Sequence, residues 1–238
     1  MKLGIMQPYL FPYLGYFQLI NAVDTFVVYD DVQYIKHGWI NRNNILGVGN
    51  NLNNQPHQFT FSIARDSFEK NINERFYSSA FEAEVERFLK TLHHRYSRAP
   101  NYRDVLDILT NILHDKNRNV SEFNARSLQI ISEHIGIETN FVYSSSFEIP
   151  SELKGEERIL ALCELLDAHE YINPIGGKEL YCSEHFERKG LTLHFIQMGD
   201  VIYKQYKNTF VPSLSIIDVM MFNKPEDICS MLNNYILI

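Results

Sequence analysis

Two short apolar runs near the start of the chain, residues 3–6 and 26–29, constrain the fold more than any other feature. The first run stops at Gln7-Pro8, and proline cannot donate to a sheet ladder, so this run predicts a buried strand that ends there. Proline also favours extended geometry in the residue before it, which places Gln7 at the strand end with its amide pointing outward. The second run is rich in β-branched and aromatic residues and predicts another strand.

The segment between the two runs predicts a turn and a helix. Pro12 and Gly15 mark the turn, and residues 16–23 favour a short helix. Strand, turn, helix and strand within about thirty residues form a βαβ unit, whose strands are parallel. In open α/β sheets, ligands bind at the carboxyl ends of the strands. Because Asp30 and Asp31 follow the second run as Gln7 follows the first, we expect all three side chains at this edge.

A simpler explanation exists for each of these residues alone. A glutamine after a strand is often a turn residue, and paired aspartates often cap a helix or face water. A binding site is favoured by the polar segment that comes next in a chain of low overall charge. That segment contains Lys36, His37, Asn41, Arg42 and Asn43. We therefore predict that Gln7, the two aspartates and this segment converge on one cavity.

Composition limits the class of protein. The chain has 238 residues, of which 45% are hydrophobic and 21% charged, as in an ordinary globular protein. Its formal net charge of −7 argues against a large DNA- or RNA-binding surface. No apolar run reaches the roughly twenty residues that span a bilayer, and no secretory signal pattern opens the chain, so we expect a cytoplasmic protein. The three cysteines are widely spaced and predict neither a disulfide framework nor a metal site.

The middle third of the chain predicts a helical segment at about 78–136. Apolar residues recur at helical spacing over 81–92 and again over 105–113. A third helix is expected to begin at Ser121, a good N-cap residue, and to end before Gly136. We assign these helices no chemistry.

The regions on either side of the helical segment predict strands and loops. Further strands are expected at 58–63, 140–143, 170–173 and 191–196, and an extended segment at 201–206. Residues 44–54 predict an irregular surface loop, for which a hairpin tip stays open. Helices are expected to open at 155, near the possible caps Ser213 and Ser215, and at 225. These patterns predict a single α/β domain over residues 1–238. Its sheet should be mainly parallel, with a Rossmann-like βαβ unit at the N-terminus.

Two strand exits carry polar or flexible residues. Ser144-Ser145-Ser146 is a hydroxyl-rich exit from the strand at 140–143, and Asn173 is followed by Gly176, Gly177 and Lys178. A strand that leads through a Gly-Gly loop into a helix can bring backbone N–H groups close to an anion. Gly-Gly is also a common turn, and the segment matches neither the GxGxxG nor the P-loop pattern.

Several segments together form a family pattern along nearly the whole chain. They are Gln7-Pro8, Pro12, Gly15-Tyr16, Asp30-Asp31-Val32-Gln33-Tyr34, Asn41-Arg42-Asn43, Tyr171 to Gly177, Leu180-Tyr181, Tyr203-Lys204-Gln205 and Leu214 to Asp218. In these segments the chain resembles the WbqC-like protein family. Members of that family occur in bacterial surface-polysaccharide (O-antigen) gene clusters, so the resemblance implies that setting, with glycine transfer onto an amino sugar as the proposed role. The resemblance carries over no catalytic residue.

The first βαβ unit is also similar in layout to the nucleotidylyltransferase-type α/β fold, where a His-x-Gly-His turn holds nucleotide phosphates. Tyr13-Leu14-Gly15-Tyr16 stands in that place, and both histidines are absent. Phenol and isobutyl groups cannot replace imidazoles that stabilise a pentavalent phosphate. We therefore expect the fold without adenylyl transfer.

The resulting functional prediction is a transferase that moves an acyl group, such as glycyl, from an activated donor to the amine of a nucleotide-linked amino sugar. The reaction needs a base, donors for an oxyanion, and contacts to the nucleotide phosphates. The candidate catalytic residues are Asp30, Asp31 and His37, histidine being the side chain that titrates near neutral pH. The candidate substrate contacts are Gln7, Tyr16, Lys36, Asn41, Arg42, Asn43, Asn173, Gly176, Gly177, Lys178, Tyr203, Gln205 and Asp218, with Lys36 and Arg42 on the phosphates.

The alternative is a non-catalytic protein of the same pathway that uses these residues to bind a sugar nucleotide or to act as a scaffold. The aromatic content of 13%, which includes Trp39 near the proposed pocket, suits ring stacking in either case. A metal-dependent hydrolase is less favoured, because Asp30-Asp31 lacks partners at ligand spacing. We expect no cofactor, no metal, no nucleic-acid partner and no membrane span. Whether the protein forms a homodimer is left open.

Overall fold

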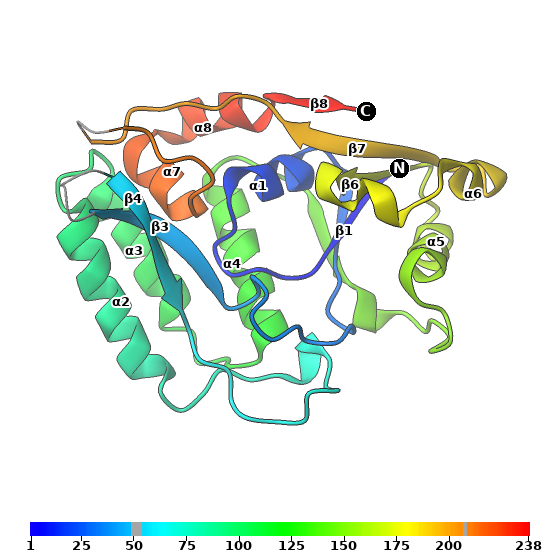
Figure 1. The fold of residues 1–238 in the computed structure, drawn as a ribbon, viewed down its shortest axis with the longest axis horizontal. Helices are drawn as coiled ribbons and strands as arrows, with labels where there is room; N and C mark the ends of the chain where they lie inside the picture. Colours follow the sequence, from blue (N-terminus) through cyan, green and yellow to red (C-terminus); the bar gives the residue numbers. More distant parts are fainter. Residues whose placement is uncertain (49–53, 207–208) are drawn as a thin grey trace.

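The computed structural model describes residues 1–48, 54–206 and 209–238, and its centre is a six-stranded sheet (Figure 1). The strands lie in the order β5-β2-β1-β6-β7-β8. Their bounds are β1 (Lys2–Met6), β2 (Thr25–Val28), β5 (Asn140–Tyr143), β6 (Glu170–Pro174), β7 (Thr192–Met198) and β8 (Tyr235–Leu237). The first five run parallel, and β8 pairs antiparallel with β7. The prediction of an α/β fold with a mainly parallel sheet is thus confirmed.

The N-terminal βαβ unit consists of β1, the helix α1 (Leu14–Asn21) and β2. The two strands are in parallel register, with Leu3 opposite Thr25 and Met6 opposite Val28. A Cβ added at Gly4 would lie 3.3 Å from side-chain carbons of Leu19 and Val23, so the glycine lets α1 pack closely on β1. The chain extends the sheet through β2 and β5 on one side of β1 and through β6 and β7 on the other, so its direction of growth reverses between β1 and β6.

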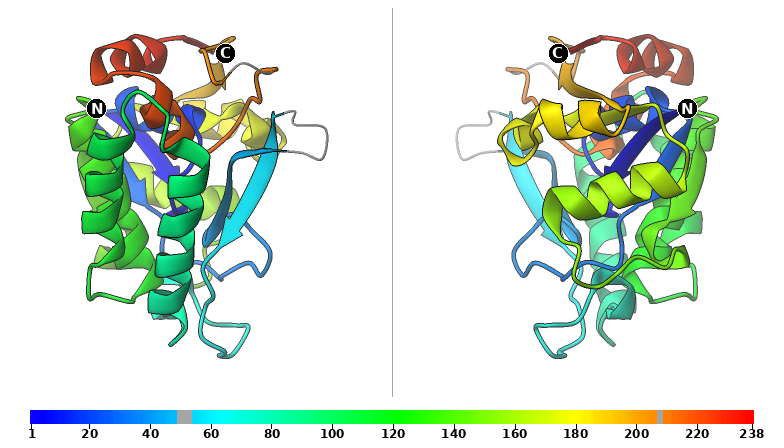
Figure 2. Two further views of the ribbon diagram at one scale, coloured as in Figure 1. Left: turned by 90° about the vertical axis from the view of Figure 1, so that its left-hand side faces the viewer. Right: turned by 90° about the vertical axis from the view of Figure 1, so that its right-hand side faces the viewer.

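Helices cover both faces of the sheet. On one face, α1 packs with α4 (Val120–His134), α7 (Ile216–Phe222) and α8 (Pro225–Leu232) over a large apolar core. On the other face, α5 (Gly155–Leu165) and α6 (Ser183–Arg188) cover a smaller core that includes Tyr171 and Phe186. Figure 2 shows α5 in front of the strands in one view and behind them in the other. This layering leaves the carboxyl ends of the strands as an edge where loops from both faces meet.

A second, two-stranded sheet lies beside the main one. It is an antiparallel hairpin of β3 (Arg42–Val48) and β4 (Asn54–Thr60). The prediction of an irregular loop over 44–54 is therefore wrong for residues 44–48 and 54, which lie in the two strands, while residues 49–53, where a hairpin tip was left open, lie outside the described part of the chain. The hairpin is held by aromatic packing on α2 (Phe81–Tyr96), where the Phe59 and Phe88 ring centroids are 4.5 Å apart. This burial overrides the polar composition of the segment.

The helical segment contains α2, α3 (Tyr102–Leu113) and α4, and a short 3₁₀ turn η1 (Ile72–Glu74) precedes it. The prediction that Ser121 caps the third helix is wrong. The cap is Asn119, whose side chain accepts a hydrogen bond from the Glu122 N–H, and Ser121 lies within the first turn. Asn and Ser have similar preference for the cap position, so sequence alone did not distinguish them.

Three other differences lie in the C-terminal third. The extended segment predicted at 201–206 belongs to no strand, and β8 was not predicted. The segment predicted as a Gly-Gly loop forms a 3₁₀ helix, η3 (Ile175–Leu180). Ser215 is confirmed as the cap of α7, since its hydroxyl accepts from the Ile217 N–H. Among the described residues, no helix combines the length and apolar character needed to cross a membrane.

Candidate functional site

Asp30 is the organising residue at the carboxyl edge of the sheet. It lies two residues after the end of β2, is 2% exposed, and accepts four hydrogen bonds. Ser121 donates to its Oδ2 over 2.9 Å and Ser145 donates through both its N–H, over 3.1 Å, and its hydroxyl, over 3.0 Å. Ser144 donates to Oδ1 over 3.2 Å. A buried carboxylate with this many donors is a stable acceptor that joins β2, α4 and the short 3₁₀ turn η2 (Ser144–Ser146).

Asp31 points to the other side of the same edge. It accepts a hydrogen bond from the Ser144 hydroxyl, which also contacts Asp30, and it forms an ion pair with Arg158 of α5. Burial raises the pKa of the neighbouring Tyr29 phenol to about 12, against the opposing charge of Arg158. The two aspartates are thus brought together through Ser144, but their remaining contacts lie on opposite faces of the sheet.

A polar cleft of about 590 Å³ opens beside Asp30. It lies within the size range of small-molecule sites, roughly 300–1,000 Å³. Its lining residues are Asp30, Asn73, Asn117, Asn119, Glu122, Arg126, Gln129, Tyr143, Ser145 and Ser146. These residues come from the β2 exit, η1, the α3–α4 loop with α4, and the β5 exit, so the cleft forms where four separate segments meet.

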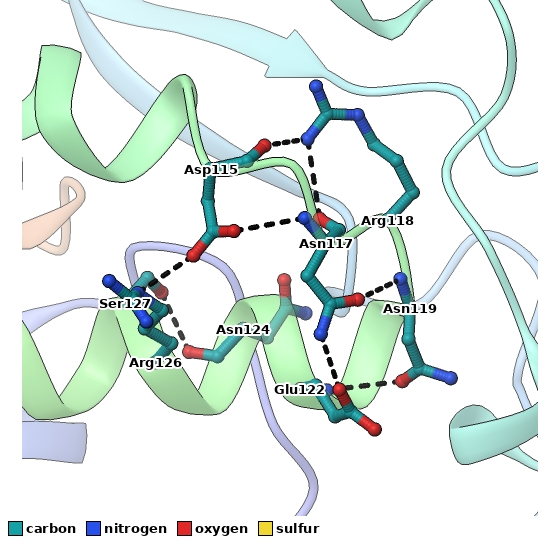
Figure 3. A network of polar contacts seen from close by, with 8 residues as sticks. All are labelled: Asp115, Asn117, Arg118, Asn119, Glu122, Asn124, Arg126 and Ser127. Atoms are coloured by element: carbon teal, nitrogen blue, oxygen red, sulfur yellow. Dashed lines mark hydrogen bonds and ion pairs between the residues drawn. The ribbon is translucent and has the colours of Figure 1, made fainter.

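The loop between α3 and α4 is rigidified by side-chain to backbone hydrogen bonds (Figure 3). Asn117 is its centre: its Oδ1 accepts from the Asn119 N–H over 2.9 Å, and its Nδ2 donates to Glu122. Asp115 accepts from the Asn117 N–H over 2.9 Å and forms an ion pair with Arg126 over 2.7 Å. These contacts hold Glu122 and Arg126 in place along the wall of the cleft.

The cleft contains both donors and acceptors for a polar ligand. Burial, followed by the charges of Glu122 and Asp30, raises the pKa of the Tyr143 phenol, so this group is a proton donor near neutral pH. Asn73 Oδ1 is buried and has no hydrogen-bond partner among the described residues. An unsatisfied buried acceptor costs about 1–3 kcal/mol, and the fold leaves this oxygen uncompensated among the described residues.

The other predicted residues of the N-terminal region lie outside this cleft. Tyr16 is buried and donates from its hydroxyl to the Gln7 carbonyl over 2.6 Å. Asn41 and Asn43 are also buried, and their amides donate to the carbonyls of Phe61 and Phe11 over 2.6 and 2.8 Å. The side chains of Lys36, His37 and Trp39 are exposed on a loop, and Arg42 is half-buried. The structure therefore brings Asp30 to the cleft without the segment from Lys36 to Asn43.

The β6 exit is compact. Asn173 is buried, donates to the Pro174 carbonyl over 3.0 Å and accepts from the Tyr171 hydroxyl over 3.1 Å. A Cβ added at Gly177 would collide with the Asn173 amide, which explains the glycine, while Lys178 and Gly176 are exposed. The proposed anion contact of this segment stays a prediction.

Tyr203, Gln205 and Asp218 do come together, but none of them lines the cleft. Asp218 is fully buried and accepts from Tyr203 over 2.6 Å, Gln205 over 2.8 Å and Tyr96 over 2.7 Å. Burial raises the pKa of the Asp218 carboxyl, and these three hydrogen bonds oppose that rise. The network joins the 201–211 segment to α7 and α2. Substrate contact by these residues stays a prediction.

Sequence reasoning missed most of the cleft. Asn73, Asn117, Asn119, Glu122, Arg126 and Gln129 all lie in or near the helical segment, to which no chemistry was assigned. Two signals were present: the hydroxyl run at 144–146 after a strand, and the asparagines clustered around the start of α4. Among the described residues, no group of three or more His, Cys, Asp or Glu side chains is arranged to hold a metal ion.

Comparison with known proteins gives one family and one curated relative. A family model described as the WbqC-like protein family matches residues 7–229. The chain is 30% identical over 225 residues to an uncharacterized protein, Rv1507c, of Mycobacterium tuberculosis (strain ATCC 25618 / H37Rv), and the match covers 93% of each chain. No solved structure matches the chain.

Proposed function

The chain belongs to the WbqC-like protein family, and we propose that it is a transferase of bacterial surface-polysaccharide biosynthesis. In this proposal it acylates, with glycyl as one candidate group, the amine of a nucleotide-linked amino sugar. The observation that supports it most is the cleft beside Asp30, whose ten lining residues are all polar or charged.

The chemistry of the lining suits a polyhydroxylated ligand. Sugar hydroxyls donate and accept at once, so they bind well to carboxylates, side-chain amides and phenols that are held in fixed positions. The cleft offers four amides, two carboxylates, three hydroxyl groups and one guanidinium from the ten residues that line it. Asn117 and Asn119 are already immobilised by the loop network, so binding would order few additional side chains.

Acyl transfer needs a proton acceptor for the attacking amine. The amine nitrogen forms a bond to the carbonyl carbon of the activated donor, and the donor's leaving group departs with the electrons of the bond that breaks. We assign the proton to Glu122, because its Oε2 is held by Asn117 while Oε1 has no partner among the described residues. The four hydrogen bonds that Asp30 accepts, two of them from Ser145, suit it to hold Ser145 in place, and catalytic roles for Asp31 and His37 stay predictions.

Thermal melting with a panel of nucleotide-linked amino sugars tests ligand binding. A ligand at one hundred times its Kd should add about 2.7 kcal/mol to the free energy of unfolding and raise the Tm accordingly. Asn73→Ala should weaken binding about tenfold, since it removes one of the four amides that line the cleft. Glu86→Gln, an exposed charge change on α2, is the control and should leave binding unchanged. The absence of a shift with every nucleotide sugar would contradict the assignment of the cleft.

An assay of acylation distinguishes the proposed transferase from a non-catalytic binding protein of the same pathway. That second function is favoured by one observation: Asp30 and Asp31 are both engaged in protein contacts. If the protein is a transferase, Glu122→Gln should retain nucleotide-sugar binding and lower the acylation rate at least a hundredfold. Binding without acylation by the wild-type protein, across thioester, acyl phosphate and aminoacyl ester donors, would favour the binding protein.

A further inference from the structure

The cleft beside Asp30 adjoins a second hollow along α4. This hollow has a volume of about 440 Å³ and shares the side chain of Gln129 with the cleft. Its lining residues come from the second half of α4, the turn that follows, and the start of β5; they are Gln129, Ser132, Glu133, Ile137, Glu138, Thr139, Asn140 and Phe141. The cleft and the hollow therefore form one groove between α4 and β5, the edge strand of the main sheet.

One face of α4 forms the long side of this groove. Its four lining residues on that face follow one another at spacings of three or four positions, and all are exposed: Glu122, Arg126, Gln129 and Glu133. An α-helix rises about 1.5 Å per residue, so Glu122 and Glu133 are about 16 Å apart along its axis. The groove is therefore longer than a single pyranose ring.

Two aromatic side chains of β5 lie on the opposite side of the groove. Phe141 lines the second hollow and Tyr143 lines the cleft. They are two positions apart in the strand, so they project from the same face, and both are half-buried against the same apolar core. The Phe141 ring is held by Phe26, with 5.4 Å between the ring centroids. Because a pyranose ring has an apolar face of C–H groups and a rim of hydroxyls, it suits an aromatic ring with amides and carboxylates beside it.

The charge of the groove favours a cationic ligand. Glu122, Glu133 and Glu138 line it, and among the described residues none of them makes an ion pair within 4.0 Å. Arg126 is the one basic side chain among the described lining residues, and Asp115 pairs with it over 2.7 Å. Three carboxylates without a cationic partner attract ammonium groups spaced along the groove.

We propose that this groove binds a short oligosaccharide of amino sugars whose amines are free. The first sugar lies beside Asp30, and the next packs on Phe141 with its ammonium group near Glu133. The inference rests on the proposed function for the sugar in the cleft. It extends that function by making the acceptor an oligosaccharide rather than a single sugar.

Isothermal titration calorimetry of the full chain with glucosamine and with its β-1,4-linked dimer and trimer tests this proposal. The affinity should increase about tenfold from the monomer to the trimer, because linked sugars fill both parts of the groove. The matched trimer in which every amine is N-acetylated has the same backbone without the charges. It should bind about fivefold more weakly than the trimer with free amines.

Two variants test the second hollow. Glu133→Gln should weaken binding of the amine trimer about threefold and leave binding of the monomer unchanged, since the monomer occupies the cleft alone. Phe141→Leu keeps an apolar side chain but removes the ring face, so it should also weaken the trimer and not the monomer. Glu86→Gln, which removes the same charge from an exposed position on α2, should change neither affinity.

Equal affinities of the monomer and the trimer, or of the amine and N-acetyl trimers, would overturn the proposal. Equal effects of Glu133→Gln and Glu86→Gln, or no saturable heat with any of these sugars, would also overturn it. The Tm shift with nucleotide-linked amino sugars should be the same in Glu133→Gln as in the wild type. A Tm shift without any preference for the trimer would therefore contradict the oligosaccharide and leave the assignment of the cleft intact.

Discussion

At the scale of single residues, Asp30 shows why a buried charge can be retained at the edge of a sheet. An ionised carboxylate is costly to bury, and here serines and a backbone N–H from two distant segments stabilise it. Its donors come from α4 and η2, which also line the cleft. The hydrogen bonds to the Asp30 carboxylate therefore help to fix the segments that line the cleft relative to β2.

Removal of the Ser121 hydroxyl should reveal this link. Because hydrogen bonds to charged groups contribute about 1.5–3 kcal/mol, Ser121→Ala should lower the free energy of unfolding by that amount. Ser132→Ala is a matched control on the same helix, since Ser132 is buried with no partner among the described residues, and it should be neutral or stabilising. In an Asp30→Ala background, Ser121→Ala should cost less than about 1 kcal/mol. Equal costs in both backgrounds, measured by urea denaturation, would show that the two side chains are not coupled.

Sequence reasoning located Asp30 correctly at the strand end, but it could not identify the donors. Two local signals can be read directly from one sequence: the proline after Gln7 and the aspartates after an apolar run. Ser121 is ninety-one positions away from Asp30, and its hydroxyl suits a helix cap as well as a carboxylate. Such pairings depend on how α4 packs on the sheet, and no spacing rule encodes that.

At the scale of elements, the start of α4 has two structural tasks. Asn119 caps the helix by accepting from the Glu122 N–H over 3.1 Å, and it donates to the Asn73 carbonyl over 2.6 Å. One side chain thus fixes both the helix that carries Glu122 and the turn that carries Asn73. The elements with strong periodicity, such as α2 and α3, were predictable, whereas β3 and β8 depend on partners supplied by the tertiary fold.

Substitutions at Asn119 can separate the two tasks. Asn119→Ala removes both hydrogen bonds and should lower the free energy of unfolding by about 1–2 kcal/mol. Asn119→Ser keeps an acceptor for the cap but loses the donor to Asn73, so it should recover about half of that loss. Guanidinium denaturation measures both values. Identical losses for the two variants would mean that the cap contributes nothing and that only the contact with Asn73 matters.

At the scale of the whole molecule, the Asp218 network joins segments that the main sheet does not connect. The Tyr96 hydroxyl donates to Asp218 and accepts from the Leu46 N–H over 2.7 Å, which links α2, α7 and the β3–β4 hairpin. Gln205 adds the 201–211 segment through paired hydrogen bonds with the Val211 backbone. The prediction that Tyr203, Gln205 and Asp218 matter together came from a family resemblance, and the structure gives them a shared physical role in holding α7 to α2 and the hairpin.

This network predicts a pH-dependent stability that Asp218→Asn should remove. Burial raises the native pKa of Asp218 above its ordinary value of 3.8, so between these two values the native state binds a proton that the unfolded state lacks. Stability from this group is therefore present at low pH and is lost as pH rises through the native pKa. The free energy of unfolding of the wild type minus that of Asp218→Asn should increase as pH falls from 7 towards 4, by at most about 1.4 kcal/mol per pH unit. Urea denaturation of both proteins across that range measures the difference, in which the titration of other carboxylates cancels. A difference that stays constant, or that grows as pH rises, would show that the three hydrogen bonds outweigh the burial of the charge.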